Sequence, residues 1–210
     1  EREIRHALRL SPKAPLPIIH LGDMMDRGPQ GVAVATEMFA RADAGPGISI
    51  LVNHENMLID IFKTSTDEPS SDLFRAFVHW LMDGGAYVLA ELNIIRPGFR
   101  SELQAQANRF ARHGASEPAL TELHKNVLKN TELQDLARKY REKTKLFHIQ
   151  DRTLFVHAGF LVTPEGKFQY KEAKGLAAFE QAQRDFAAGT IDQDSLKKII
   201  WPEPEDDYSV

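Results

Sequence analysis

Two apolar segments, each followed by a polar loop and then by a helical pattern, constrain the fold of this chain most strongly. Residues 16–21 run into a Gly-Asp loop, and residues 32–42 then repeat apolar side chains at helical spacing. Residues 48–52 form a continuous apolar run, as a fully buried strand does, and a second helical pattern covers residues 57–62. A strand, a short loop and a helix that occur twice in succession predict an α/β sheet.

The remaining segments are predicted to be mainly helical. We expect the helix over residues 72–83 to end at a Gly84-Gly85 C-cap. Gln150-Asp151 separates two short strand patterns and predicts a tight hairpin. The expected elements are a helix over residues 72–83, a helical insertion over 93–145, strands over 145–149 and 152–156, and a helix over 173–188.

Composition limits the kind of protein. The 210 residues include 26 Lys and Arg against 30 Asp and Glu, and a net charge of -4 argues against binding nucleic acid through a basic face. The absence of cysteine excludes a disulfide scaffold, a thiolate nucleophile and a Cys-ligated zinc site. No apolar run approaches the ~18 residues that span a bilayer, and the charged residues 1–9 do not resemble a signal peptide. We therefore expect one domain over residues 1–210, in the cytoplasm, without nucleic-acid or membrane partners.

Three polar clusters each follow a predicted strand directly. They are residues 22–28, residues 53–55 and residues 157–159. Ligands of open α/β sheets bind at the carboxyl ends of strands, so these clusters could converge on one site. Carboxylate, amide and imidazole groups together suit divalent transition metals, and two such metals can activate a bridging water for attack on phosphorus. An arginine beside the site offers a planar fork to phosphate oxygens.

In order and spacing, these clusters resemble three signature blocks of the calcineurin-like metallophosphoesterases. The resemblance is closest to the phosphoprotein-phosphatase branch, which includes bacterial serine/threonine phosphatases and diadenosine tetraphosphatases. Trp80 followed by Gly84-Gly85 also resembles a stretch of the bacterial members. The match extends over residues 16–160. It implies a sandwich of two mixed β-sheets flanked by helices.

The resemblance also implies a role for each matching residue. By position, Asp23 matches the carboxylate that bridges two metals, and Asn53 and His157 match ligands of the second metal. His54 matches the histidine that protonates the leaving alkoxide, and Asp26 matches the carboxylate that orients this histidine. Arg27 matches a phosphate-binding arginine. A histidine held by a carboxylate can supply such a proton near neutral pH. The expected cofactors are two divalent ions, Mn, Fe or Zn.

The implied activity is hydrolysis of phosphate esters by a metal-bridging hydroxide. The expected substrate is a phosphorylated protein, as for a serine/threonine phosphatase, or a small phosphoester. A diadenosine polyphosphate hydrolase shares the same blocks and stays an alternative. A non-catalytic member that binds phosphate or a partner through an incomplete metal site is a further alternative.

The chain departs from the family pattern in three places. An Asp-x-His block is expected before residue 16, and a Gly-His block is expected after His157; neither is present. We expect the chain to be part of a longer protein that supplies them; a degenerate member is the competing explanation. Val52 stands where the family usually has glycine, and its bulk beside Asn53 could perturb the ligand geometry.

Each of these residues also has a purely structural interpretation. Gly-Asp after a strand is often a simple turn, and Asp26-Arg27 could be a local ion pair. Asn53 could act as the N-cap of the following helix. His157 could be a satisfied core histidine. Glu55 is interpreted as support for the site or for the helix dipole rather than as a ligand.

Overall fold

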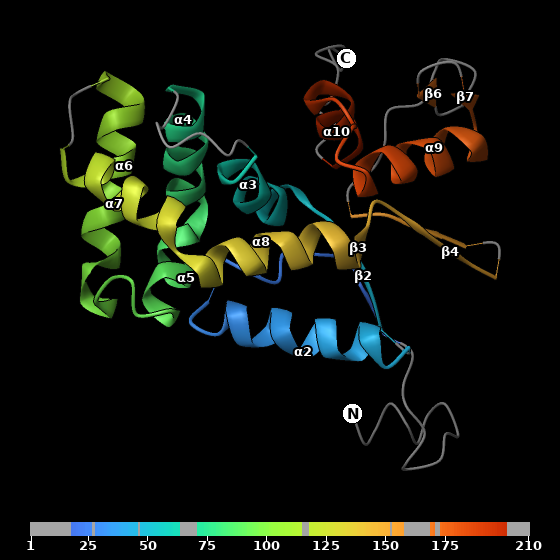
Figure 1. Ribbon diagram of the computed structural model, residues 1–210, viewed down its shortest axis with the longest axis horizontal. Helices are drawn as coiled ribbons and strands as arrows, with labels where there is room; N and C mark the ends of the chain where they lie inside the picture. The colour runs from blue at the N-terminus through green and yellow to red at the C-terminus, as the bar shows by residue number, and fades with distance from the viewer. Residues whose placement is uncertain are drawn as a thin grey trace, which may run out of the picture.

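The computed structural model describes residues 18–26, 28–45, 47–63, 71–114, 118–151, 153–157, 169–170 and 173–200 (Figure 1). The helices are α2 (Gly31–Asp43), α3 (Asn53–Ile61), α4 (Ser71–Trp80), the π-helical turn η1 (Leu81–Gly85), α5 (Ala86–Glu91), the 3-10 turn η2 (Pro97–Phe99), α6 (Arg100–His113), α7 (Pro118–Lys129), α8 (Thr131–Lys143), α9 (Leu176–Ala187) and α10 (Gln193–Ile200). The strands are β1 (Ile18–His20), β2 (Gly47–Ile50), β3 (Thr144–Lys145), β4 (His148–Gln150), β5 (Thr153–Phe155), β6 (Gln169–Tyr170) and β7 (Ala173–Lys174). The expected mixed α/β class is confirmed.

A short parallel sheet with the strand order β1-β2-β3 lies at the centre of the fold. Ile19 pairs with Ile48, and Ile50 pairs with Lys145, so three segments far apart in sequence run in the same direction. The other two pairs are antiparallel: β4 with β5, and β6 with β7. Because the parallel strands all end on the same side, the loop after β1 and the start of α3 lie close together.

Helices cover this sheet and hold it in register. The helix α2 packs against β2, and α8 packs against α3 and against α2. An ion pair between Lys143 and Asp43 joins the ends of α8 and α2. The start of α2 has no capping side chain of its own; instead Glu91, the last residue of α5, accepts the N–H groups of Val32 and Ala33, both at 2.9 Å. A carboxylate at a helix N-terminus satisfies free donors and complements the helix dipole.

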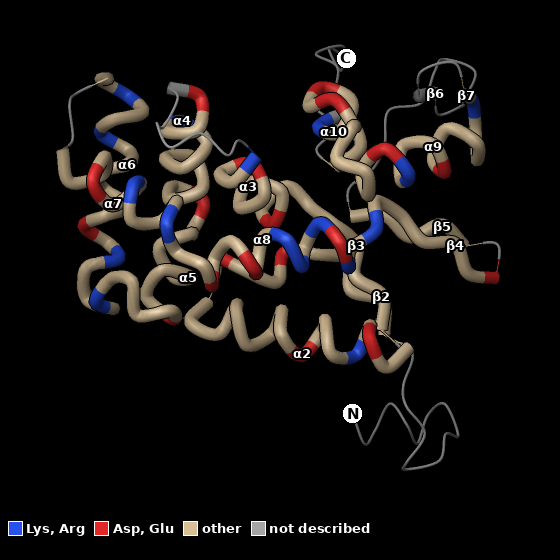
Figure 2. Tube along the Cα trace, viewed as in Figure 1, with Lys and Arg blue, Asp and Glu red and all other residues tan. Residues whose placement is uncertain are grey.

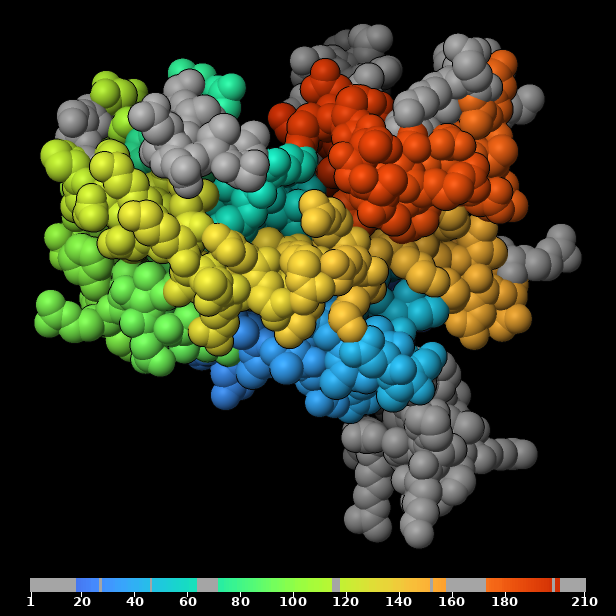
Figure 3. All heavy atoms as spheres, viewed as in Figure 1, coloured from blue at the N-terminus to red at the C-terminus, as the bar shows by residue number. Residues whose placement is uncertain are grey.

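The hydrophobic core is continuous from the helices α4–α7 to the helices α9 and α10. Leu120 of α7, Tyr140 of α8 and Phe186 of α9 are all buried in one cluster of side chains. In Figure 3, the surface of α8 runs between α2 on one side and α9 with α10 on the other. The segment 93–145, expected as an insertion, is helical, and its last helix α8 is an integral part of the central packing.

The helix expected to end at Gly84-Gly85 is interrupted there. Gly84 has φ 113° and ψ 2°, which is not helical, so α4 with the start of η1 and α5 lie on opposite sides of a kink at this glycine. A β-carbon added to Gly84 would lie 2.0 Å from the carbonyl oxygen of Asp26, and one added to Gly85 would lie 2.4 Å from the Trp80 ring. Glycine is needed here because the backbone of the loop after β1 approaches the helix this closely.

The strand expected over residues 145–149 divides into two. Thr144 and Lys145 pair with β2 in the parallel sheet, whereas His148 begins the hairpin with β5. The helix α10 was not expected from the sequence, and α3 begins at Asn53, four residues earlier than expected. Within the described helices, none combines the length and the apolar character needed to cross a membrane.

Candidate functional site

The loop after β1 holds two aspartates in an uncommon backbone conformation. Asp23 has φ 53° and Asp26 has φ 74°, both in the left-handed region that aspartate tolerates better than most residues. The backbone N–H of Met24 between them donates to Glu55 Oε1 at 2.8 Å. Such backbone strain persists only where the surroundings fix it, so the hydrogen bond to Glu55 helps to hold this loop in its conformation. The interpretation of Glu55 as support fits this contact.

Val52 contacts the same loop from the end of β2. A β-carbon added to Gly22 would lie 1.7 Å from Val52 Cγ1, so the valine occupies the space that a side chain at position 22 would need. The pair of Gly22 and Val52 therefore brings the ends of β1 and β2 together. Val52, which stands where the resemblance implies glycine, thus packs against the loop after β1.

Asp26 and His54 form a buried pair. The exposed fraction is 2% for Asp26 and 5% for His54, and Asp26 Oδ2 lies 3.4 Å from His54 Nδ1. This is longer than a usual hydrogen bond, as often found for catalytic pairs without bound substrate. Burial raises the pKa of the Asp26 carboxyl, while hydrogen bonding to His54 lowers it.

The helix that follows fixes Asp26 from the other side. Gly84 touches its backbone, as described above, and the Trp80 side chain lies near its carboxylate and lowers its pKa. Among the described residues, neither Asp26 Oδ1 nor Trp80 Nε1 has a hydrogen-bond partner of normal geometry. The sequence pointed to Trp80 and Gly84-Gly85 only through the resemblance to the bacterial members and did not connect them with Asp26. The two glycines are the signal for the close backbone approach.

Asp23 and His157 approach one another at the ends of β1 and β5. His157 Nδ1 lies 2.6 Å from the carbonyl oxygen of Leu21, which requires a proton on Nδ1 because the carbonyl is an acceptor. In the neutral imidazole, Nε2 is then left with its lone pair, 3.9 Å from Asp23 Oδ1. Both side chains are partly exposed, at 22% for His157 and 32% for Asp23.

This pair fits a shared metal ion. Two donors bound to one ion at ~2.1 Å each lie no more than ~4.2 Å apart, so a separation of 3.9 Å is compatible with one coordination sphere. A metal-binding histidine typically donates its other ring N–H to a backbone carbonyl, as His157 does to Leu21. Carboxylate oxygen with imidazole nitrogen is a donor set that manganese, iron and zinc accept.

Asn53 lies in the first turn of α3, directly before His54. The N-cap is Val52, so the alternative interpretation of Asn53 as the helix cap is wrong. Asn53 is half-buried and lines a cavity between α3, α4 and α10. Arg27 and residues 158–159 lie outside the described residues. The structure therefore brings together Asp26 with His54 and Asp23 with His157, and no described contact joins Asn53 to either pair.

Glu55 adds a third carboxyl group to this region. It is fully buried, and its pKa is raised to about 7, mainly by desolvation, with additional effects of the Asp26 and Asp23 charges. Like-charged carboxyl groups that share a buried site cannot all ionise easily. A cation bound near them would relieve this repulsion.

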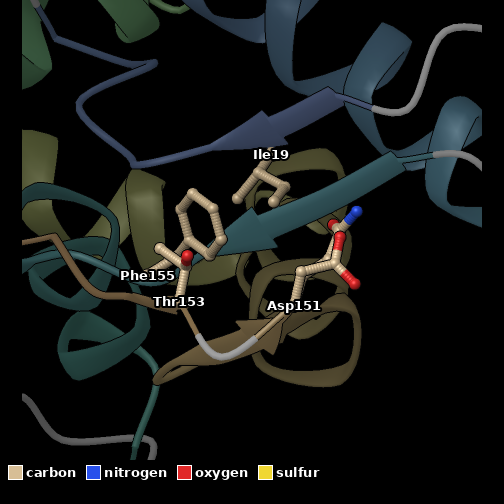
Figure 4. A pocket seen from close by; sticks show the side chains of 5 residues that line it. Ile19, Asp151, Thr153 and Phe155 are labelled. Carbon is tan, nitrogen blue, oxygen red and sulfur yellow. The ribbon is translucent and has the colours of Figure 1, made fainter.

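A second hollow, of about 310 Å³, lies between β1 and the hairpin of β4 and β5 (Figure 4). Ile19 from β1 and Phe155 from β5 face one another across it. Among the described residues, Asp151 is the single charged residue that lines it, and no described basic side chain is placed there to bind phosphate. Figure 2 shows both acidic and basic residues along α6, α7 and α8.

Comparison of the chain with protein-family models, with curated proteins and with solved structures found no match.

Proposed function

We propose that this chain is a metal-dependent phosphoesterase with the two-sheet sandwich of the calcineurin-like metallophosphoesterases. The observation that carries the proposal is the arrangement of two pairs at neighbouring strand ends: Asp23 facing His157, and Asp26 facing His54. The first pair has the donors and spacing of metal ligands. The second pair has the burial and geometry of a proton donor with its orienting carboxylate.

Asp23 and His157 would hold metal, with Asn53 as a further oxygen ligand from the start of α3. Two divalent ions, when bound, would supply an activated water and neutralise charge on the phosphoryl group. The contact of His157 with Leu21 holds the ring so that Nε2 is aimed at Asp23. Arg27 would bind the phosphoryl oxygens through its planar guanidinium.

His54 would give its proton to the departing oxygen of the ester. Asp26 Oδ2 faces Nδ1 of the ring, so Nε2 is the atom that carries this proton. Because both side chains are almost fully buried, water cannot easily compete for the proton, and the carboxylate stabilises the protonated imidazole more strongly than it would in water. The substrate class is a phosphate monoester, with phosphoserine or phosphothreonine in a protein as the first candidate.

Hydrolysis and metal content together test this proposal. The purified chain is loaded with Mn²⁺ and assayed on p-nitrophenyl phosphate, on a phosphothreonine peptide and on diadenosine tetraphosphate. His54→Ala should lower kcat by about 10²–10⁴-fold without loss of bound manganese, because His54 acts on the proton and not on the metal. Asp23→Asn should lose both manganese and activity.

The control is His113→Ala, at the exposed end of α6, which should change neither quantity. Equal loss of manganese in the His54 and Asp23 variants would contradict the two separate roles. Absence of manganese binding and of hydrolysis by the unaltered chain would favour a non-catalytic binding domain instead.

A further inference from the structure

A cavity of about 380 Å³ lies between α3, α4 and α10, and Asn53, the residue before His54, is among the residues that line it. Figure 3 shows the surface of α3 between α10 and the helices α4–α7. Met57, Ala76 and Ile200 give the cavity apolar walls. Its volume is within the range of sites for small organic molecules, which combine such walls with a few polar groups.

One of these polar groups is a buried amide with an unused acceptor. Asn56 is 4% exposed and lines the cavity. Its Nδ2 donates to Asp60 Oδ2 at 3.1 Å, whereas its Oδ1 has no hydrogen-bond partner among the described residues. A buried oxygen of this kind is rarely left unpaired. It offers a ready acceptor to a hydroxyl or amide donor of a bound molecule.

Basic side chains reach the cavity from two helices. Arg75 and His79 lie one turn apart on α4, and Lys197 faces them from α10. Arg75 and Lys197 are exposed. The charge of Lys197 also acts on Asp60 and lowers the pKa of that carboxyl, against the larger effect of burial, which raises it. Two positive charges on separate helices can bind one anionic group together.

Two carboxylates also line the cavity, and they differ in their partners. Asp60 is engaged by Lys63 at 2.6 Å and by the amide groups of Asn56 and Gln193, both at 3.1 Å. Its charge is thus compensated within the protein. Asp72 is exposed in the first turn of α4 and can accept a further hydroxyl group. The cavity therefore combines cations for an anion with acceptors for hydroxyl groups.

We propose that this cavity binds a small phosphate monoester that also carries hydroxyl groups, as sugar phosphates and nucleotides do. The phosphate lies between Arg75 and Lys197, and a hydroxyl group donates to Asn56 Oδ1. A phosphate monoester fits better than a carboxylate because its charge of about -2 at pH 7 matches two cations. Among the described residues that line the cavity, Asn53 is the one that the proposed metal site also uses, while Asp23, Asp26, His54 and His157 do not line it. The inference does not depend on the phosphoesterase proposal.

The test is calorimetric titration of the chain carrying Asp23→Asn, so that a phosphoester is not consumed during the measurement. The probes are ribose 5-phosphate, adenosine 5'-monophosphate, inorganic phosphate and ribose. Ribose 5-phosphate should bind at least about tenfold more tightly than phosphate or ribose, since it engages both halves of the site. A further gain with adenosine 5'-monophosphate would identify a nucleotide site, and no gain would identify a sugar phosphate site.

Substitutions then locate the binding. Arg75→Ala with Lys197→Ala should weaken binding of ribose 5-phosphate by about tenfold or more, whereas Lys125→Ala on the exposed face of α7 should leave it unchanged. Both cavity residues are exposed, and a far-ultraviolet spectrum confirms that the variant is folded. Asn56→Leu removes the hydroxyl acceptor and should abolish the preference for ribose 5-phosphate over phosphate.

The inference is overturned if the protein binds none of the probes at millimolar concentration. It is also overturned if binding survives the double substitution but is lost with His54→Ala, since the phosphate then lies at the proposed catalytic site. That second outcome would leave the phosphoesterase proposal intact, so the two proposals fail separately.

Discussion

His124 and Glu55 are buried residues whose pKa values move in opposite directions. His124 is fully buried against Phe77 and Phe74, and its two ring nitrogens have no hydrogen-bond partner among the described residues. Burial lowers the pKa of His124 to about 4, from an ordinary value of 6.5. Burial raises the pKa of Glu55 to about 7, from an ordinary value of 4.5. Between about pH 4 and about pH 7, the fold therefore keeps both groups uncharged.

These two shifts have opposite effects on stability as the pH changes. Below pH 6.5 the unfolded chain binds a proton at His124, whereas the folded chain does not bind it until about pH 4. The free energy of unfolding therefore decreases as the pH falls from 6.5 to about 4. Above pH 4.5 the unfolded chain releases a proton at Glu55 that the folded chain keeps, so stabilisation is lost as the pH rises to about 7. Each effect amounts to about 3 kcal/mol at most. Burial also raises the pKa of Asp26 and Asp60, which adds to the Glu55 effect.

Single substitutions should separate the two effects between pH 4.5 and 7. For chelator-treated protein, His124→Leu should leave a free energy of unfolding that falls as the pH rises, because the buried carboxyl groups then dominate. Glu55→Gln should shift the slope in the opposite direction, since the His124 contribution is no longer offset by Glu55. Urea unfolding at four pH values measures both slopes. His113→Ala serves as the control and should keep the slope of the unaltered chain; identical slopes in all four proteins would contradict the assigned pKa shifts.

The kinked passage from α4 to α5 is the element that most directly supports the proposed site. Gly84→Ala should destabilise the protein by about 3 kcal/mol or more, because its β-carbon would meet the Asp26 carbonyl and the backbone has φ 113°. Gly114→Ala, with φ 60° but open space around it, should cost only about 1 kcal/mol. Gly98→Ala, with neither restriction, should stay within about 0.5 kcal/mol. Urea unfolding ranks the three variants, and a Gly84 variant no less stable than the Gly114 variant would refute the close approach.

Most elements could be predicted from sequence because their apolar spacing is strong. The helix expected over residues 32–42 is observed as α2, and the hairpin expected around Gln150 is observed as β4 with β5. Gly84 was expected to end a helix, and the helix does break there. Its contact with Asp26 could not be predicted, because a C-cap glycine and a glycine at a close backbone contact have the same sequence signature. Thr144 and Lys145 could not be assigned to the parallel sheet because two residues carry no periodicity, and their pairing with β2 depends on tertiary structure.

Residues of the candidate site could be predicted from the sequence only where they directly follow a predicted strand. Asp26 and His54 come together because the loop after β1 and the first turn of α3 share one edge of the sheet. The orientation of Asn53 into the neighbouring cavity depends on the packing of α3 against α4 and α10, which no local pattern specifies. Trp80 could not be linked to Asp26 from the sequence, because the contact joins residues more than fifty positions apart.

At the scale of the whole molecule, the continuous core joins the helices α4–α7 to α9 and α10 (Figure 1). The helix α8 contributes Leu133, Leu136 and Tyr140 to this cluster and contacts both α3 and α9. A core shared in this way predicts that both ends of the molecule unfold together.

Cooperative unfolding can be tested with substitutions at opposite ends of the core. Leu120→Ala in α7 and Phe186→Ala in α9 should each lower the free energy of unfolding by about 2–5 kcal/mol, because both side chains are almost fully buried. With Trp201→Phe as the background, Trp80 is the only tryptophan and reports on the α4 end. Phe186→Ala should then shift the Trp80 fluorescence transition and the far-ultraviolet circular dichroism transition to the same lower urea concentration. Lys125→Ala, at the surface of α7, should leave both transitions in place. If Phe186→Ala shifts the circular dichroism transition but not that of Trp80, the two ends unfold independently, and the site at the start of α3 would be supported by the α4–α7 helices alone.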